Sequence, residues 1–357
     1  MRILLTGGGS GGSAAPVIAV ADAIARRLPS AEFLYVITTT GPERAMVQAA
    51  GLHHATIRTG RLRRYASWRN FTDPALATAG LGQAVAVVRQ FRPDVAFGAG
   101  GFATVPPLMA ARLARVPVVV HQQDVQPGLA NRMLAPFAVD CTVALEDTHR
   151  WPRWSDAPVV GNPVRAAMLQ GTAERARQLF GLERGRPTVL ITGGGTGALR
   201  LNQIAAEAAA DLIEVCQIVH LTGVGKRVPG PTSAAYRQVE FLTDEMADAL
   251  AVADVVVSRA GMSALAEIGA RGKASILVPM PDSHQGLNAA AVARRGAALV
   301  LMEPRLTPGS LVEAVRSLLG DPNRRMALGT AAAALLPAAA ADIVADRLLS
   351  FGLREPD

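Results

Sequence analysis

The chain carries the same strand-to-loop pattern twice, about half its length apart. The first copy reads ILLTGGGSGGS from Ile3 to Ser13, and the second reads VLITGGGTGAL from Val189 to Leu199. In each copy a short run of apolar and β-branched residues, typical of a buried strand, precedes a glycine-rich turn. Both turns fit the spacing Gly-x-Gly-x-x-Gly/Ala, which lets backbone N–H groups at the start of a helix approach an anion. The sequence therefore predicts two related α/β domains.

Short apolar runs alternate with segments of helical periodicity through both halves, which is typical of parallel sheets covered by helices. The alternation restarts after the turn Gly161-Asn162-Pro163. A length of 357 residues, 50% of them hydrophobic, suffices for two buried cores. We therefore expect an α/β fold of two doubly wound, Rossmann-like domains facing a cleft, with residues 1–163 in the first and 164–337 in the second. Ligands bind such sheets at the carboxyl ends of the strands.

The basic residues are almost all arginines. The net charge is +7, yet the only lysines are Lys226 and Lys273. The planar guanidinium of arginine suits recognition of phosphate or carboxylate. Aromatic residues make up 4% of the chain and do not interleave with a basic run, so few stacking platforms exist for nucleic acid. We expect anionic small molecules or an anionic membrane surface as partners, and no nucleic acid.

Neither a metal nor an organic cofactor is indicated. Cys141 and Cys216 lie far apart, and no Asp-x-Asp motif occurs. A nicotinamide-binding domain needs an acidic residue at the end of its second strand, where the chain instead has Thr38 in one half and His220 in the other. No Gly-Lys-Ser/Thr follows either glycine turn, which excludes a P-loop. The alternative to phosphate binding is that both glycine turns are only tight connections that let a helix pack against the strand before it.

In the second half, polar residues follow two predicted strands. The segment Val257–Ala266 runs from a strand into a helix whose first amides can hold a diphosphate, and the carboxylate of Glu267, one turn into this helix, can accept two hydrogen bonds from a ribose. Gln285 and Asn288 follow the strand Ile276–Val278, and their amides match sugar hydroxyls. The alternatives need no ligand: Glu267 is then an ordinary acid that complements the helix dipole, and Gln285 and Asn288 belong to a plain loop-to-helix cap.

In the first half, the segments Gly98–Phe102 and His121–Arg132 each follow a predicted strand, so both reach the same edge of the sheet. His121 has two interpretations, a site residue or a hydrogen-bonded core histidine. The cluster Arg61–Phe71 combines arginines with amphipathic aromatic rings, which suits anionic lipid headgroups. The alternative for this cluster is a solvated loop.

The sequence also bears on membranes. Met1 is followed directly by a strand-like run, without the apolar region and cleavage site of a signal peptide. Charge-free apolar stretches such as Ala75–Val88 and Thr330–Ala341 are shorter than the roughly 18 to 20 residues of a spanning helix. We therefore expect a protein that lies on a membrane rather than spanning it.

Taken together, an ordered series of motifs resembles the MurG-type transferases of peptidoglycan synthesis. The series covers nearly the whole chain: the opening glycine loop, GRLRRYASWRNFTDP, FRPDVAFGAGGFATVP, HQQDVQPGLANR, GNPVR, ITGGGTGALRLN, FLTDEMADAL, SRAGMSALAEI and HQGLNA. The resemblance implies the GT-B fold, with a last helix in residues 338–357 that returns to the first domain. It implies inverting transfer of N-acetylglucosamine from UDP to an undecaprenyl-diphosphate-linked muramoyl-pentapeptide, by a peripheral protein on the cytoplasmic face of the plasma membrane.

The resemblance also implies roles for individual residues. Thr243 would meet the uracil, Glu267 the ribose, Gln285 and Asn288 the sugar, and Arg165 the UDP at the linker. The opening glycine loop would cup the acceptor and the donor diphosphate. The other implied substrate contacts are Gly195, Thr196, Met262, Ser263, Ala264, Leu265 and Ala266 at the diphosphate, and Ser10, Gly11, Gly12, Asp124 and Asn131 in the first domain.

This sequence departs from the family pattern where the acceptor would be deprotonated. Ser13 stands where the family usually has a histidine, the favoured proton acceptor, and serine is no base at neutral pH without a partner. The family's His-Glu-Gln-Asn becomes His121-Gln122-Gln123-Asp124, and Gly195 replaces a frequent serine. Our hypothesis places catalysis among Asp124, His121 and Ser13, with Asp124 or His121 taking the proton.

Two alternative functions remain open at this point. One is a same-fold UDP-sugar transferase that acts on another lipid or a natural-product acceptor, because the altered residues gather on the acceptor side. The other is a catalytically impaired paralogue that binds a UDP-sugar and has lost its chemistry with the histidine.

Overall fold

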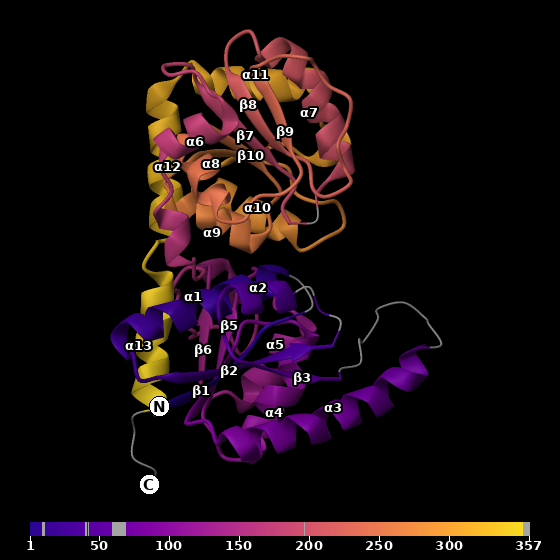
Figure 1. Cartoon of the computed structure of the whole chain (residues 1–357), viewed down its shortest axis with the longest axis vertical. Coiled ribbons are helices and arrows are strands. Elements are labelled where there is room, and N and C mark those ends of the chain that lie inside the picture. The colour runs from indigo at the N-terminus through magenta and orange to yellow at the C-terminus, as the bar shows by residue number, and fades with distance from the viewer. Residues whose placement is uncertain (9–10, 40, 42, 59–68, 196, 353–357) are drawn as a thin grey trace. The chain divides into compact units, whose positions relative to one another are not determined.

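The computed structural model describes residues 1–8, 11–39, 41, 43–58, 69–195 and 197–352. The chain forms two compact units (Figure 1): unit 1 comprises Met1–Arg165 with Ala339–Asp357, and unit 2 comprises Ala166–Ala338. The division thus falls after Arg165, where the sequence patterns placed it after residue 163. Each unit is an α/β fold with one parallel sheet, and this part of the prediction is confirmed.

Unit 1 contains a six-stranded sheet in the order β3-β2-β1-β4-β5-β6, and every pairing is parallel. This is the strand order of dinucleotide-binding domains. Along β1, Ile3 and Leu5 face one buried cluster and Leu4 faces another, because successive side chains point to opposite faces of a strand. The strands are β1 (Arg2–Thr6), β2 (Glu32–Thr38), β3 (His54–Ile57), β4 (Val95–Gly98), β5 (Val118–Gln122) and β6 (Asp140–Val143).

The helices of unit 1 cover both faces of its sheet. The first helix begins at Gly11, so Gly11 to Ser13, at the end of the opening glycine motif, form its first turn. These elements are α1 (Gly11–Arg27), α2 (Glu43–Ala49), α3 (Arg69–Phe91), η1 (Phe102–Thr104), α4 (Val105–Leu113), α5 (Leu129–Leu134), η2 (Ala135–Phe137), η3 (Glu146–Arg150) and α13 (Ala340–Gly352).

Unit 2 repeats the same topology. Its sheet has the order β12-β11-β10-β7-β8-β9. When the strands of each unit are numbered from one to six along the chain, both sheets have the order 3-2-1-4-5-6. The strand β8 of unit 2 therefore corresponds to β2 of unit 1. The strands are β7 (Thr188–Thr192), β8 (Gln217–Leu221), β9 (Tyr236–Val239), β10 (Val255–Ser258), β11 (Ala274–Leu277) and β12 (Leu299–Val300).

The helices of unit 2 follow its strands as the sequence alternation predicts. Side chains define several of their starts: Thr307 and Ser310 form a reciprocal capping box at α11, and Asp321 caps α12. The elements are η4 (Ala166–Leu169), α6 (Ala173–Phe180), α7 (Leu199–Leu212), α8 (Glu245–Val252), α9 (Met262–Ala270), α10 (Gln285–Arg294), η5 (Glu303–Arg305), α11 (Pro308–Leu319) and α12 (Pro322–Leu335).

The last helix, α13, belongs to unit 1 although it follows unit 2 in the chain. It lies beside α1 (Figure 1), and its apolar residues Val344 and Leu348 are fully buried in the same cluster as the α1 side chains. Arg347 forms a bidentate ion pair with Asp140 of β6, at 2.7 and 2.8 Å. The packed face and the ion pair together hold the C-terminal helix to the first sheet.

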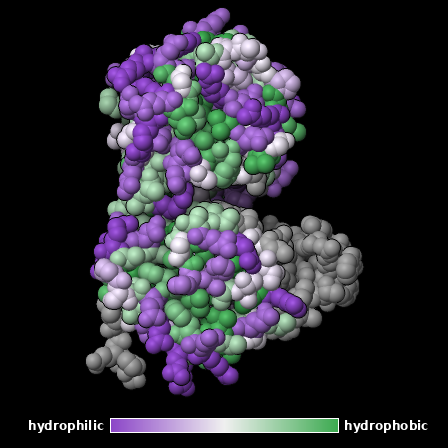
Figure 2. Space-filling view, viewed as in Figure 1, coloured by the Kyte–Doolittle hydropathy of each residue, from purple (hydrophilic) through white to green (hydrophobic). Residues whose placement is uncertain are grey.

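By length and composition alone, the segment Pro322–Gly352 is long and apolar enough to cross a membrane. The sequence patterns did not predict this, because the charge-free stretch Thr330–Ala341 within the segment is too short. It consists of two helices, because α12 ends at Leu335 and α13 begins at Ala340. Each buries apolar residues in its own unit. With 14 residues in α12 and 13 in α13, each helix by itself is shorter than the roughly 18 to 20 residues of a spanning helix. On the face shown in Figure 2, hydrophobic side chains gather among hydrophilic ones in each unit.

Candidate active site

The glycine loop of unit 2 leads from β7 into α7 and is shaped by close backbone packing. A Cβ on Gly193 would lie 2.4 Å from the backbone nitrogen of Ala198, and one on Gly197 would lie 2.4 Å from the carbonyl oxygen of Thr222. Gly194 and Gly197 adopt φ angles of 75° and 67°, which favour glycine. The loop therefore requires glycine for its conformation, and its amides lie at the carboxyl edge of the sheet.

At the same edge, α9 begins without a side-chain cap. Its N-cap residue Gly261 has extended backbone and no side chain to bond the first amides. The first turn, Met262 to Ala264, thus presents N–H groups at the positive end of the helix dipole. Met262 is buried, whereas Ser263 and Ala264 are half-buried; Leu265 and Ala266 are buried and belong to the core.

Two amide side chains of α10 lie against this helix start. Asn288 is fully buried, and its Nδ2 donates to the carbonyl oxygen of Ala260 at 3.1 Å. The Oε1 of Gln285 accepts the backbone N–H of Met280 at 3.0 Å, and its Nε2 lies 3.9 Å from the position of a Cβ on Gly261. Gln285 therefore directs an N–H donor toward the first turn of α9. The structure brings these predicted residues together.

An ion pair that the sequence did not predict holds these loops. Arg259, at the end of β10, pairs with Glu303 of η5, and both side chains are largely buried. Its Nη1 also donates to the carbonyl oxygen of Val278 at 3.1 Å. Arg259 thus connects the loops that follow β10, β11 and β12. The one signal in the sequence for this ion pair was an arginine directly after a predicted buried strand. Its partners could not be named because they are distant in the sequence.

The predicted uracil contact lies on the loop before α8. Thr243 is exposed, and its N–H and Oγ1 both donate to Oε2 of Glu245, at 3.1 and 3.0 Å. With Phe241 and Leu242 it lines a cavity of about 300 Å³. Glu267 is half-buried on α9, and Arg165, also half-buried, is the last residue of the first segment of unit 1.

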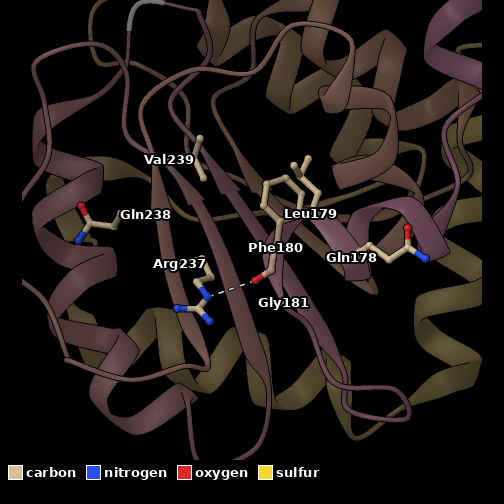
Figure 3. Close-up of a pocket in the computed structure, with 7 residues that line it drawn as sticks. All are labelled: Gln178, Leu179, Phe180, Gly181, Arg237, Gln238 and Val239. Carbon is tan, nitrogen blue, oxygen red and sulfur yellow. Dashed lines mark hydrogen bonds between the residues drawn. The ribbon is translucent and has the colours of Figure 1, made fainter.

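A neighbouring cavity of about 390 Å³ contains none of the predicted site residues (Figure 3). It lies between the end of α6 and the edge strand β9, where Arg237 donates from Nε to the carbonyl oxygen of Phe180 at 3.1 Å. Within the described part of the chain, no group of three or more histidine, cysteine or acidic side chains could hold a metal ion.

In unit 1, the opening glycine loop lies against a buried carboxylate. Glu43, the first residue of α2, is fully buried, and its Oε1 accepts the N–H and the hydroxyl of Thr38, at 3.2 and 2.8 Å. A Cβ on Gly8 would lie 2.8 Å from the same oxygen. The hydroxyl of Tyr35 donates to the carbonyl oxygen of Gly7 at 2.8 Å. Ser13 is largely buried in the first turn of α1, after the exposed Gly12.

His121 occupies the core rather than an open site. Its side chain is fully buried, its Nδ1 lies 2.9 Å from Oγ1 of Thr142, and its Nε2 lies 3.2 Å from Oδ1 of Asn162. Because an amide oxygen only accepts, Nε2 carries the proton and Nδ1 accepts from the Thr142 hydroxyl. Burial lowers the pKa of His121 to about 4. These contacts favour the core interpretation, so the structure does not support His121 as the proton acceptor.

Asp124 and Asn131 differ in their exposure. Asp124 is half-buried on the loop after β5. Asn131 is buried, and its Nδ2 donates to the carbonyl oxygen of His121 at 3.0 Å and to Oε1 of Gln122 at 2.7 Å. Asn131 thus shapes the loop that carries Asp124. Ser10, Thr196 and the stretch 61–68 lie outside the described residues, as do the side chains of Arg69 and Phe71.

His220 of β8 resembles His121 in its surroundings. Its Nδ1 lies 2.8 Å from the hydroxyl of Tyr236, its Nε2 lies 3.2 Å from Oδ1 of Asn202, and burial lowers its pKa to about 4. Unfolded histidine binds its proton near pH 6.5, so the unfolded chain takes up protons before the folded one. The stability from these two neutral histidines is complete above this pH and is lost as the pH falls toward 4.

We expect the unfolding free energy in urea to be lower at about pH 5 than at about pH 7.5, by about 2 kcal/mol for each of the two histidines. The H121Q variant should lose about half of this pH dependence, and H53Q, which changes an exposed histidine, should keep all of it. An H121Q chain with the full pH dependence would show that His121 is not held neutral by its burial.

Comparison with known proteins places these features in a family. The chain matches the glycosyltransferase family 28 N-terminal domain over residues 3–142 and the C-terminal domain over residues 188–344. A crystal structure of MurG from Acinetobacter baumannii has a similar fold, with a TM-score of 0.76 at 24% identity over 98% of this chain and 99% of that one. This likeness confirms the expected GT-B fold.

Curated relatives are more similar in sequence. The UDP-N-acetylglucosamine–N-acetylmuramyl-(pentapeptide) pyrophosphoryl-undecaprenol N-acetylglucosamine transferase of Symbiobacterium thermophilum is 38% identical over 90% of this chain and 88% of its own length. The protein of the same name from Moorella thermoacetica is 38% identical over 94% of this chain and 95% of its own. The chain therefore belongs to glycosyltransferase family 28, among the UDP-N-acetylglucosamine–N-acetylmuramyl-(pentapeptide) pyrophosphoryl-undecaprenol N-acetylglucosamine transferases.

Proposed function

We propose that this chain transfers N-acetylglucosamine from UDP-N-acetylglucosamine to an undecaprenyl-diphosphate-linked N-acetylmuramyl-pentapeptide, a step of peptidoglycan biosynthesis. The observation that carries the proposal is the uncapped start of α9 at Gly261 with the Nε2 donor of Gln285 beside it. Such a site offers backbone amides to a diphosphate and a fixed side-chain donor to the adjoining sugar. The curated relatives are named for the same donor and acceptor.

Unit 2 binds the donor in this proposal. The amides of Met262 to Ala264 hold the diphosphate, with the glycine turn Gly193 to Gly195 as a further contact. Glu267 accepts the ribose hydroxyls, and the loop at Thr243 meets the uracil beside the cavity lined by Phe241 and Leu242. Arg259 does not need to touch the donor, because its pairing with Glu303 keeps the loops in place.

The proposed reaction is one displacement at the anomeric carbon. The acceptor hydroxyl oxygen forms a bond to this carbon, the bond to the diphosphate oxygen breaks, and its electron pair leaves with UDP. A single displacement inverts the configuration from α to β. The amides of α9 face the negative charge that develops on the departing UDP, which stabilises the transition state.

Unit 1 binds the acceptor, and Asp124 takes the proton of its hydroxyl in this proposal. A carboxylate is an effective base once the oxygen it deprotonates becomes more acidic in the transition state. Asp124 is half-buried on the loop after β5, whereas His121 is fully buried in the core. Ser13 has only a hydroxyl, so we assign it a part in shaping the first turn of α1 and no proton transfer.

Unit 1 also carries a surface suited to a membrane. Leu129, Met133 and Phe137 are spaced four residues apart along α5 and η2, and 42%, 44% and 46% of their surfaces are exposed. The exposed Arg132 lies in the same turn. Apolar side chains flanked by arginine suit an interface of acyl chains and anionic headgroups. We therefore propose that this face docks peripherally on the anionic, cytoplasmic surface of the membrane that holds the acceptor.

The experiment for the function is product analysis with UDP-N-acetylglucosamine and a short-chain analogue of the lipid-linked acceptor. The wild-type chain should form the glycosylated acceptor. The D124N variant should lower kcat about 10²- to 10⁴-fold, because a general base is lost, with KM for the donor within about threefold. D156N changes an exposed aspartate and serves as the control.

Unchanged turnover in D124N would remove Asp124 from the mechanism. Hydrolysis of the UDP-sugar without transfer by the wild-type chain would favour a different acceptor, and tight binding without any consumption would favour an impaired paralogue.

For the membrane surface, M133E and F137E should each weaken binding to vesicles containing anionic lipid, by about tenfold or more, since a large apolar side chain is lost and a negative charge is added. V224E, at an exposed valine of unit 2, should bind as the wild-type chain does. Sedimentation with vesicles measures the effect. Equal binding of all four proteins would rule out this face.

A further inference from the structure

Lys226 lies at the glycine loop of unit 2, on the turn that follows β8. Its Nζ donates to the carbonyl oxygen of Gly197 at 3.4 Å, and a Cβ on Gly197 would lie 3.1 Å from its Cδ. The side chain therefore runs along the loop, and its ammonium lies at the loop's backbone. Neither the motifs nor the proposed function gives this residue a role.

The backbone of Lys226 is fixed to α7. The Nδ2 of Asn202 donates to the carbonyl oxygens of Thr222 and Lys226, at 2.8 and 3.1 Å, and its Oδ1 faces Nε2 of His220. Asn202 and His220 are fully buried. Because these buried hydrogen bonds hold the backbone of Lys226 in place, the position of its ammonium is set mainly by the conformation of the lysine side chain.

The two glycine loops differ in the charge beside them. The strands β2 and β8 occupy the same place in their sheets, and each is followed by a segment that reaches its glycine loop. In unit 1 this segment brings the Glu43 carboxylate against Gly8, and in unit 2 it brings the Lys226 ammonium against Gly197. A carboxylate disfavours a bound phosphate by like-charge repulsion, whereas an ammonium favours it.

We propose that the Lys226 ammonium binds the diphosphate of the nucleotide donor, which makes it a further donor-binding residue. Gly195 in the same loop has no side-chain donor, so a side chain from a neighbouring turn supplies the contact. An ammonium has three N–H donors, and bonds between charged groups are about twice as strong as neutral ones. The proposal rests on the proposed function, because it requires that unit 2 binds a UDP-sugar.

The same contact bears on the reaction. When the bond from the anomeric carbon to the diphosphate oxygen breaks, negative charge on UDP increases. A fixed ammonium then interacts more strongly with the departing UDP than with the bound donor. Loss of Lys226 should therefore lower kcat as well as donor affinity.

The test compares the affinity of the full chain for UDP and for uridine, measured by calorimetry. K226Q should weaken UDP binding about 10- to 100-fold, the effect of losing one charge-assisted bond, and leave uridine binding within about twofold. K226R, which keeps the charge, should recover part of the UDP affinity. K273Q changes the other lysine, whose Nζ donates to the carbonyl oxygens of Ala251 and Ala253, and should bind UDP as the wild-type chain does.

Two results would overturn the proposal: K226Q that binds UDP like the wild-type chain, or K226Q that weakens UDP and uridine equally, which is the result of a purely structural role. Unchanged uridine binding also verifies that the variant is folded. A wild-type chain that binds no UDP would contradict the proposed function itself, and is thereby distinguished from failure of the lysine alone.

Discussion

The candidate site depends above all on the parallel pairing of the strands in each sheet. Because every strand points the same way, every loop after a strand emerges at one edge, and residues from β7, β8, β10 and β11 meet there without any local sequence relation. Asn288 on α10 reaches the carbonyl oxygen of Ala260 across this edge. The chemistry of the site therefore follows from topology first and from individual side chains second.

The structure also separates two glycine loops that look alike in sequence. Both glycine motifs stand between a strand and a helix, but Gly8 of the first lies against the buried Glu43 and Gly197 of the second lies against Lys226. The charge brought by the segment after the second strand distinguishes them, and it favours the loop of unit 2 as the phosphate-facing one. Each sheet also has a buried, neutral histidine near the carboxyl end of one strand, His121 in β5 and His220 in β8.

Much of the fold could be predicted from local patterns. The apolar runs that begin at Ile3 and Val189 predicted strands, and the glycine turns after them predicted two related domains. These signals could be recognised because each extends over only a few neighbouring residues. The partners of His121 could not be predicted, since Thr142 and Asn162 are 21 and 41 residues away and only the fold brings them together. The same holds for Arg259 with Glu303. For the candidate site, Gln285 and Asn288 could be named from their amides, but their orientation required the backbone of Met280 and Ala260.

The central claim is that the start of α9 holds the diphosphate of the donor. A crystal structure of the chain with UDP-N-acetylglucosamine tests it most directly. The account predicts diphosphate oxygens within hydrogen-bond distance of the amides of Met262 to Ala264, with Nε2 of Gln285 donating to a sugar oxygen. A nucleotide bound at the glycine loop of unit 1, or in the cavity beside Arg237 (Figure 3), would contradict it.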